Sequence, residues 1–234
     1  MLHWSRQRAL DMKKANSILV AIWTLLAGYL LLLEAGAFPW WDAIWVLLLS
    51  TLAYGGLVSL SGLAKARACA GIVLVAFSAL IALTIFTGWP LGPMRFCGPE
   101  GLKLGGTFPL LPPLLALALL TLAQKSAAQI FSTFERNALA AISSGFFCFT
   151  LANGLIFLSK TRLWWLWNPW GGGGAFMQAV IAFVTLAIAG FFLARIYPED
   201  TGLKLTRWSP EGVVLLCVNA LFLTVNILFF AQRL

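Results

Sequence analysis

The sequence predicts an all-α protein, a polytopic bundle of transmembrane helices with about seven spans. Composition is the first reason: of 234 residues, 61% are hydrophobic and only 10% are charged, whereas a soluble domain of this length needs far more charge on its surface. The second reason is a mean hydropathy of +0.90. The third is segment length, because a helix needs roughly 20 mostly apolar residues to cross about 30 Å of hydrocarbon.

The predicted spans follow one another with short connections. In order they are Ser17–Gly36, Ala43–Leu63, Cys69–Trp89, Phe108–Leu122, Ala138–Leu158, Ala175–Arg195 and Gly212–Ala231. The fourth is the shortest. Pro109 is tolerable near its start, but the Pro112-Pro113 pair should bend or loosen its first turns. Residues 1–16 form a basic cytoplasmic arm, and residues 17–234 form a single transmembrane domain.

The distribution of Lys and Arg predicts the orientation. With the N-terminus inside, 11 of the 16 basic residues are cytoplasmic and 5 lie outside, as the positive-inside rule requires. We therefore expect a multi-pass protein of a bacterial cytoplasmic membrane with its C-terminus outside. This topology and attraction to anionic membrane lipid explain the net charge of +8, so we expect no nucleic-acid partner.

Metal binding is not expected. The four cysteines have no CxxC spacing, and His3 is the only histidine, so the usual ligands of a zinc or iron site are missing.

Two predicted outer loops differ in character from the other connections. Pro90–Thr107 carries five glycines and three prolines, and Ser159–Gly174 crowds four tryptophans into Trp164–Trp170 before four consecutive glycines. Loops of this length are usually functional or packed into a site. We expect both loops on one face of the membrane, packed against each other.

Tryptophan is concentrated at the predicted outer interface. Eight of the eleven lie there, namely Trp40, Trp41, Trp45, Trp89, Trp164, Trp165, Trp167 and Trp170. One interpretation is an aromatic belt, which indoles form where bilayer meets water. The other is a stacking platform for the end of a long conjugated or isoprenoid ligand, and the crowding within Trp164–Trp170 slightly favours it.

The two loops carry a resemblance to a known family. Thr87–Gly92 (TGWPLG), followed by Leu102–Leu110 (LKLGGTFPL) and later by Trp165–Trp167 (WLW) and Gly171–Gly174, resembles the motifs of the membrane-embedded carotenoid-biosynthesis hydratases. These all-helical proteins add water to the terminal double bond of acyclic carotenoids. The likeness covers about residues 75–195 in order and spacing, and Met94 and Phe96 stand where the family has tyrosines.

The chain departs from the family at the acid. Hydrating an alkene needs a proton donor, normally a carboxyl group whose pKa is raised by desolvation. At the family's Asp-rich position the chain has Asn153 and, four residues on, Phe157. Glu34 and Glu100 are the weak catalytic candidates that remain. The resemblance therefore implies a protein without catalytic residues and without a required cofactor.

This interpretation predicts an accessory subunit that binds a carotenoid or similar polyisoprenoid and associates with other membrane subunits. The predicted ligand contacts are Trp89, Phe96, Asn153, Trp164, Trp165, Trp167, Trp170 and Gln178. Two alternatives are an active hydratase that uses Glu34 or Glu100, and a small transporter or channel component.

Polar and small residues within the spans have a structural interpretation as well. Amides in hydrocarbon turn toward the bundle and bond across helices, which is the main expectation for Asn153, Gln178, Asn219 and Asn226. Gly55-Gly56 and Gly71 are predicted to be positions where helices pack closely.

Overall fold

The computed structural model describes residues 39–97, 103–131, 134–156, 165–167, 175–197 and 217–224, with the single positions 214 and 227. The predicted arm 1–16 and the span Ser17–Gly36 lie outside the described residues. The described positions within the predicted span Gly212–Ala231 are helical.

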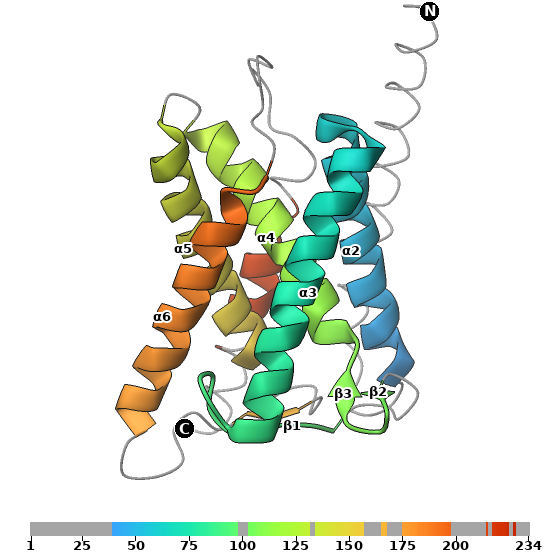
Figure 1. Ribbon diagram of the computed structural model, residues 1–234, viewed down its shortest axis with the longest axis vertical. Coiled ribbons are helices and arrows are strands. Elements are labelled where there is room, and N and C mark those ends of the chain that lie inside the picture. The colour runs from blue at the N-terminus through green and yellow to red at the C-terminus, as the bar shows by residue number, and fades with distance from the viewer. Residues whose placement is uncertain are drawn as a thin grey trace, which may run out of the picture.

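The described chain is mostly helical, as predicted (Figure 1). Its helices are α2 (Pro39–Ser61), α3 (Leu63–Thr87), α4 (Leu111–Ile130), α5 (Arg136–Ile156) and α6 (Ala175–Ala194). Four short strands accompany them: β1 (Met94–Phe96), β2 (Lys103–Leu104), β3 (Phe108–Pro109) and β4 (Trp165–Trp167). All four strands lie at one end of the bundle (Figure 1).

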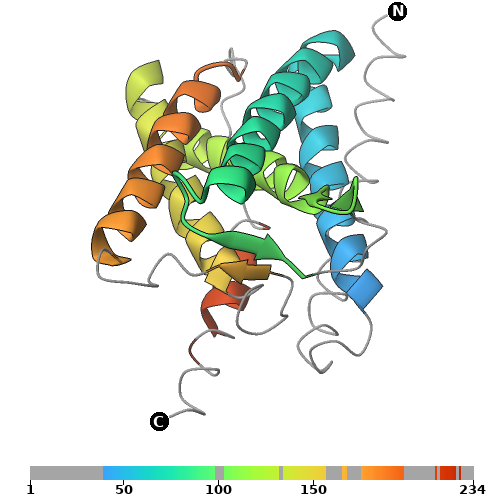
Figure 2. The ribbon, with the colours of Figure 1, turned by 60° about the horizontal axis from the view of Figure 1, so that its bottom comes forward.

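Helix α4 is the centre of the bundle. It packs against α2 and α3 on one side and against α5 on the other, and α5 packs against α6 (Figures 1 and 2). The buried leucines and alanines of α4 itself lie on all sides of the helix, which is the pattern of a core helix. In the most apolar 18-residue stretch of α4, 78% of the residues are buried, whereas the corresponding share in α3 is 33%. Helix α3 is therefore peripheral.

The fourth predicted span is shifted in the structure. Helix α4 begins at Leu111 and continues to Ile130, because Phe108 and Pro109 pair with Leu104 and Lys103 in an antiparallel hairpin instead. Gly105 and Gly106 make its turn with φ of 60° and 74°, values that L side chains rarely adopt.

The expected loosening at Pro112-Pro113 was wrong. Both prolines lie in the first turn of α4 and are buried. The amide groups of a first turn have no partner within the helix, so the missing N–H groups of proline cost nothing there.

Two described helices are long and apolar enough to cross a membrane, α3 and α4. Helices α2 and α6 contain shorter apolar stretches, Ala43–Val58 and Val180–Ala194.

Cross-helix contacts correct two side-chain predictions. Trp45 is 2% exposed and packs edge-to-face on Phe222, with ring centroids 5.7 Å apart, so it belongs to the core and not to an interfacial belt. Its position explains this, because Trp45, Leu49 and Leu52 share the buried stripe of α2 at helical spacing. Gly71 is exposed with no atom within 4 Å of an added Cβ, so it is not a close-packing position among the described residues.

The predicted bonding of polar amides across helices is confirmed for Asn219. Its Nδ2 donates to Thr150 Oγ1 of α5 at 2.8 Å. Thr150 Oγ1 itself donates to the carbonyl of Phe146 at 2.7 Å, so the one hydroxyl serves as both donor and acceptor.

Candidate functional site

The segment after α3 turns the chain back under the bundle. Gly88 ends α3 in the left-handed conformation with φ 72°, and its N–H donates to the Thr84 carbonyl at 2.8 Å. Thr87 Oγ1 accepts the N–H of Trp89 at 3.1 Å. Pro90, Leu91 and Gly92 are then buried. The motif at Thr87–Gly92 thus forms a fixed turn that delivers the chain into β1.

Strand β1 pairs with β4, and this pair is called the ribbon below. The pairing is antiparallel, with Met94 opposite Trp167, Arg95 opposite Leu166 and Phe96 opposite Trp165. Figure 2 shows the ribbon lying across one end of the helices. The prediction that the two loops pack against each other is therefore confirmed over residues 94–96 and 165–167. That both loops lie on one face of the membrane stays a prediction.

The register relates the family-like positions to each other. Cross-strand partners occupy one face of an antiparallel pair. Met94 and Phe96, which stand at the tyrosine positions of the resemblance, are therefore paired with Trp167 and Trp165. Met94 is 9% exposed and belongs to the core cluster, so its own side chain packs against the bundle.

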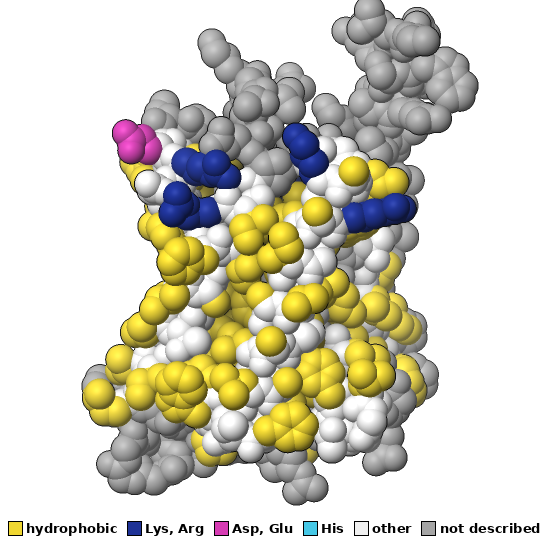
Figure 3. Space-filling view, viewed as in Figure 1, with side chains coloured by type: hydrophobic (Ala, Val, Ile, Leu, Met, Phe, Trp, Pro, Cys, Tyr) yellow, Lys and Arg dark blue, Asp and Glu magenta, His cyan; other side chains and the backbone are white. Residues whose placement is uncertain are grey.

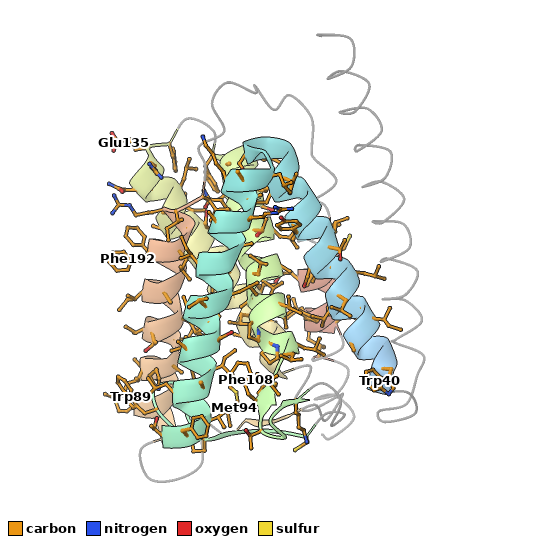
Figure 4. All side chains as sticks on the ribbon, turned by 45° about the vertical axis from the view of Figure 1, so that its right-hand side comes forward. Trp40, Trp89, Met94, Phe108, Glu135 and Phe192 are labelled. Carbon is orange, nitrogen blue, oxygen red and sulfur yellow. The ribbon has the colours of Figure 1, made fainter. Side chains whose placement is uncertain are left out.

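The structure describes the side chains of only some of the predicted ligand contacts. Trp89 is 56% exposed and lies at the ribbon end beside the bundle (Figure 4). Asn153 is half-buried on α5, and its Nδ2 donates to the Phe149 carbonyl at 3.0 Å. Of Phe96, Trp165, Trp167 and Gln178 the structure describes the backbone alone. Trp164, Trp170, Glu34 and Glu100 lie outside the described residues.

Most of the described basic side chains lie at the end of the molecule away from the ribbon, whereas Lys103 of β2 lies at the ribbon end. Lys65 and Arg67 at the start of α3, Arg136 at the start of α5 and Arg195 after α6 are exposed; we call this the cationic end. Figure 3 shows Lys and Arg side chains gathered at the end of the molecule opposite the one where Figure 1, in the same view, shows the strands. Glu135, the one carboxylate whose side chain is placed within the described ranges, is also at this end (Figure 4). Asp42, in the first turn of α2 at the ribbon end, has only its backbone described, so none of the side chains that the structure places at this end carries a carboxyl group.

Two hydroxyls meet in the interior near the cationic end. Tyr197 Oη lies 2.7 Å from Thr121 Oγ1, and both side chains are buried. Burial is the main cause that raises the pKa of Tyr197 far above its usual value, and the nearby Cys69 raises it further. Sequence patterns did not single out this contact, because it joins residues 76 positions apart.

Within the described ranges, no three His, Cys, Asp or Glu side chains gather in a way that could hold a metal ion. The absence of a metal site remains a prediction for the whole chain.

Comparisons of the chain with protein-family models, with curated proteins and with solved structures give no match.

Proposed function

We propose that the chain is a multi-pass protein of the bacterial cytoplasmic membrane, with about seven spans and the cationic end inside. The outward surface of the helices supports this. Large apolar side chains are exposed along α3 and α6, including Val75, Phe86, Met177, Ile188 and Phe192. Exposed apolar patches of this extent mark membrane or protein contact.

Internal hydrogen bonding supports the same proposal. Ser50, Thr51, Thr84, Thr87, Thr121 and Thr150 each donate to the carbonyl four residues earlier. In hydrocarbon a hydroxyl has no water to bond, so this pattern suits helices that face lipid.

The two ends fit the proposed orientation. Trp40 and Trp89 are 46% and 56% exposed at the ribbon end, where indoles suit a membrane–water interface, and the basic residues at the opposite end follow the positive-inside rule.

We further propose that the protein binds a carotenoid or a similar polyisoprenoid without transforming it, as an accessory subunit of a larger membrane assembly. The observation that carries this is the pairing of Met94–Phe96 with Trp165–Trp167. It joins the two segments that resemble the carotenoid hydratases into one ribbon, with a buried methionine facing the bundle. Aromatic faces along such a ribbon would stack on the flat end of a polyene.

Purification of the full chain in mild detergent tests the binding proposal. An absorption spectrum of protein from a carotenoid-producing host should contain the vibronic bands of a polyene in constant ratio to protein. Met94→Asp places a charge on the buried face of the ribbon and should lower the pigment ratio, whereas Leu104→Asp, at a residue 65% exposed on the neighbouring hairpin, should not. A pigment-free wild type after reconstitution with carotenoid would refute the proposal.

An activity assay separates a binding protein from an enzyme. Membranes containing the protein and an acyclic carotenoid should yield no hydrated product. A product that disappears in Glu34→Gln or Glu100→Gln would establish an active hydratase instead.

A further inference from the structure

An arginine of α5 contacts the backbone of the arginine that directly follows α6 at the cationic end. The guanidinium of Arg136, from the first turn of α5, donates to the backbone carbonyl of Arg195 just after α6. The Arg195 guanidinium lies over the ring of Phe191, 5.9 Å from its centroid. The first contact satisfies a carbonyl at the C-terminus of α6, where a positive charge is favourable. It also brings two arginines from separate helices to one place on the surface.

An apolar face leads away from this pair along α6. Met177, Val184 and Ile188 are separated by seven and four residues, so they share one face of α6, and Arg195 directly follows the end of this helix. The three apolar members are between 50% and 61% exposed, and Phe192 beside them is 60% exposed. Figure 4 places Phe192 below Glu135 on the same side of the molecule. The face is therefore apolar along its length and cationic at one end.

From this juxtaposition we infer that the outward face of α6 binds one anionic phospholipid, with its phosphate on Arg136 and Arg195 and its acyl chains on Ile188 and Phe192. The inference rests on the proposed membrane location. Charge complementarity selects the occupant, because an anionic lipid brings both a net negative charge for the two arginines and acyl chains for the apolar face, whereas a zwitterionic lipid has no net charge. Arginine suits the role, since its planar fork can give two parallel hydrogen bonds to a phosphate.

Native mass spectrometry of the full chain in detergent tests the inference. The probes are dioleoyl phosphatidylglycerol and dioleoyl phosphatidylcholine, which have the same acyl chains. The first lipid molecule should bind with about tenfold higher affinity when it is the glycerol lipid, because the choline cation of the other lipid cancels the net negative charge that basic residues attract, worth about 1 kcal/mol for each Lys or Arg near the membrane surface. Inorganic phosphate at the same concentration should not compete, because it lacks the chains that contact α6.

Variants locate the site. Arg195→Gln should abolish most of the preference for phosphatidylglycerol, and Arg195→Lys should keep part of it, since the charge remains and the fork is lost. Arg136→Gln should act in the same direction but also removes a cap of α6, so Arg195 provides the cleaner variant. The matched controls are Lys65→Gln and Arg67→Gln, which remove exposed charge at the same end on α3 and should leave the preference intact.

Other outcomes overturn the inference. Equal affinity for the two lipids would exclude a site that selects an anionic lipid, and an equal loss in the α3 controls would mean a diffuse attraction to the whole cationic end. Competition by inorganic phosphate would indicate an anion site without a lipid. If the wild type is recovered in the carbonate-washed membrane fraction, the proposed membrane location holds, and the outcomes above concern the lipid site alone.

Discussion

The hydroxyl of Tyr197 donates a hydrogen bond to Thr121 Oγ1, which ties the chain after α6 to the central helix. The donor follows from counting hydrogens. Thr121 Oγ1 already donates its one hydrogen to the Leu117 carbonyl at 2.8 Å, so across the 2.7 Å separation it accepts from Tyr197. This contact and the Arg136 contact to the Arg195 carbonyl both fix the end of α6 against its neighbours.

Replacing Tyr197 with phenylalanine should destabilise the protein by about 1 kcal/mol, the net worth of one buried hydrogen bond. The loss is limited because Thr121 keeps its bond to Leu117. Thermal unfolding in detergent, followed by circular dichroism, measures it. Tyr54→Phe is the matched control, since Tyr54 is half-buried on α2 and has no hydrogen-bond partner in the described part of the chain. Equal losses in both variants would contradict the prediction.

The raised pKa of Tyr197 makes stability depend on pH in the alkaline range. Burial raises the folded-state pKa above the ordinary value of 10.0. Below that ordinary value the tyrosine is neutral in both states and its contribution is complete. As the pH rises further, only the unfolded state loses the proton, so stability falls. Unfolding measured between pH 8 and about 11 should therefore decline more steeply for the wild type than for Tyr197→Phe, and parallel profiles would count against the assignment.

Asn219 and Thr150 should show a measurable energetic coupling. A double-mutant cycle with Asn219→Leu and Thr150→Val removes each side of the 2.8 Å bond in turn. The coupling energy should be about 0.6 kcal/mol, the average for hydrogen bonds between membrane helices. Unfolding in mixed micelles of increasing dodecyl sulfate content provides the four free energies. A coupling indistinguishable from zero would mean that the bond adds nothing to the packing of these helices.

The sequence predicted the positions of the helices but not the strand pairing of the ribbon. Long apolar runs allow few structures other than helices, and α2, α3, α5 and α6 lie close to their predicted positions. The start of α4 was missed because Phe108 and Pro109 are as apolar as the helix that follows, while their pairing with Leu104 and Lys103 depends on a glycine turn. The ribbon joins segments about 70 residues apart, and no local pattern specifies such a register.

The other errors concerned which side of its helix a residue occupies. Trp45 and Gly71 were assigned by residue type, as an interfacial indole and as a close-packing glycine. The structure turns Trp45 inward onto Phe222 and leaves Gly71 at the surface. After Arg67, helix α3 is apolar around its whole circumference, so composition alone does not distinguish its buried side from its outward side.

Gly190 is the close-packing glycine between α5 and α6. A Cβ added there would lie 3.0 Å from Ser144 Oγ and 3.1 Å from Phe147 Cδ1. Ser144 cannot easily move, because it donates to the Ala187 carbonyl at 2.6 Å. Gly190→Ala should therefore destabilise the protein by about 1–3 kcal/mol through overpacking.

Gly145 provides the control for Gly190 on the adjoining helix. It is exposed on α5, and an added Cβ would meet no atom within 4 Å. Gly145→Ala should stabilise the helix by about 0.5–1 kcal/mol, because alanine loses less backbone freedom on folding. Thermal unfolding of both variants should give shifts of opposite sign. Shifts of the same sign would mean that α5 and α6 are not packed as closely as the structure indicates.

The proposed orientation predicts which cysteine an impermeant reagent reaches in intact cells. Cys97 directly follows β1 at the ribbon end and is exposed, whereas Cys69 and Cys148 are buried. Cys217 is exposed on its helix, but in a membrane its thiol would face hydrocarbon, where a charged maleimide does not enter. Labelling of intact cells should therefore modify Cys97 alone, and Cys97→Ser should abolish the signal.

For the opposite side, Lys65→Cys in a background with the four native cysteines replaced by serine places one thiol at the cationic end. That thiol should react only after the membrane is permeabilised. Labelling of the Lys65→Cys variant in intact cells, with Cys97 protected in the wild type, would reverse the orientation. Labelling of both thiols in intact cells would remove the membrane barrier between the two ends and with it the proposed topology.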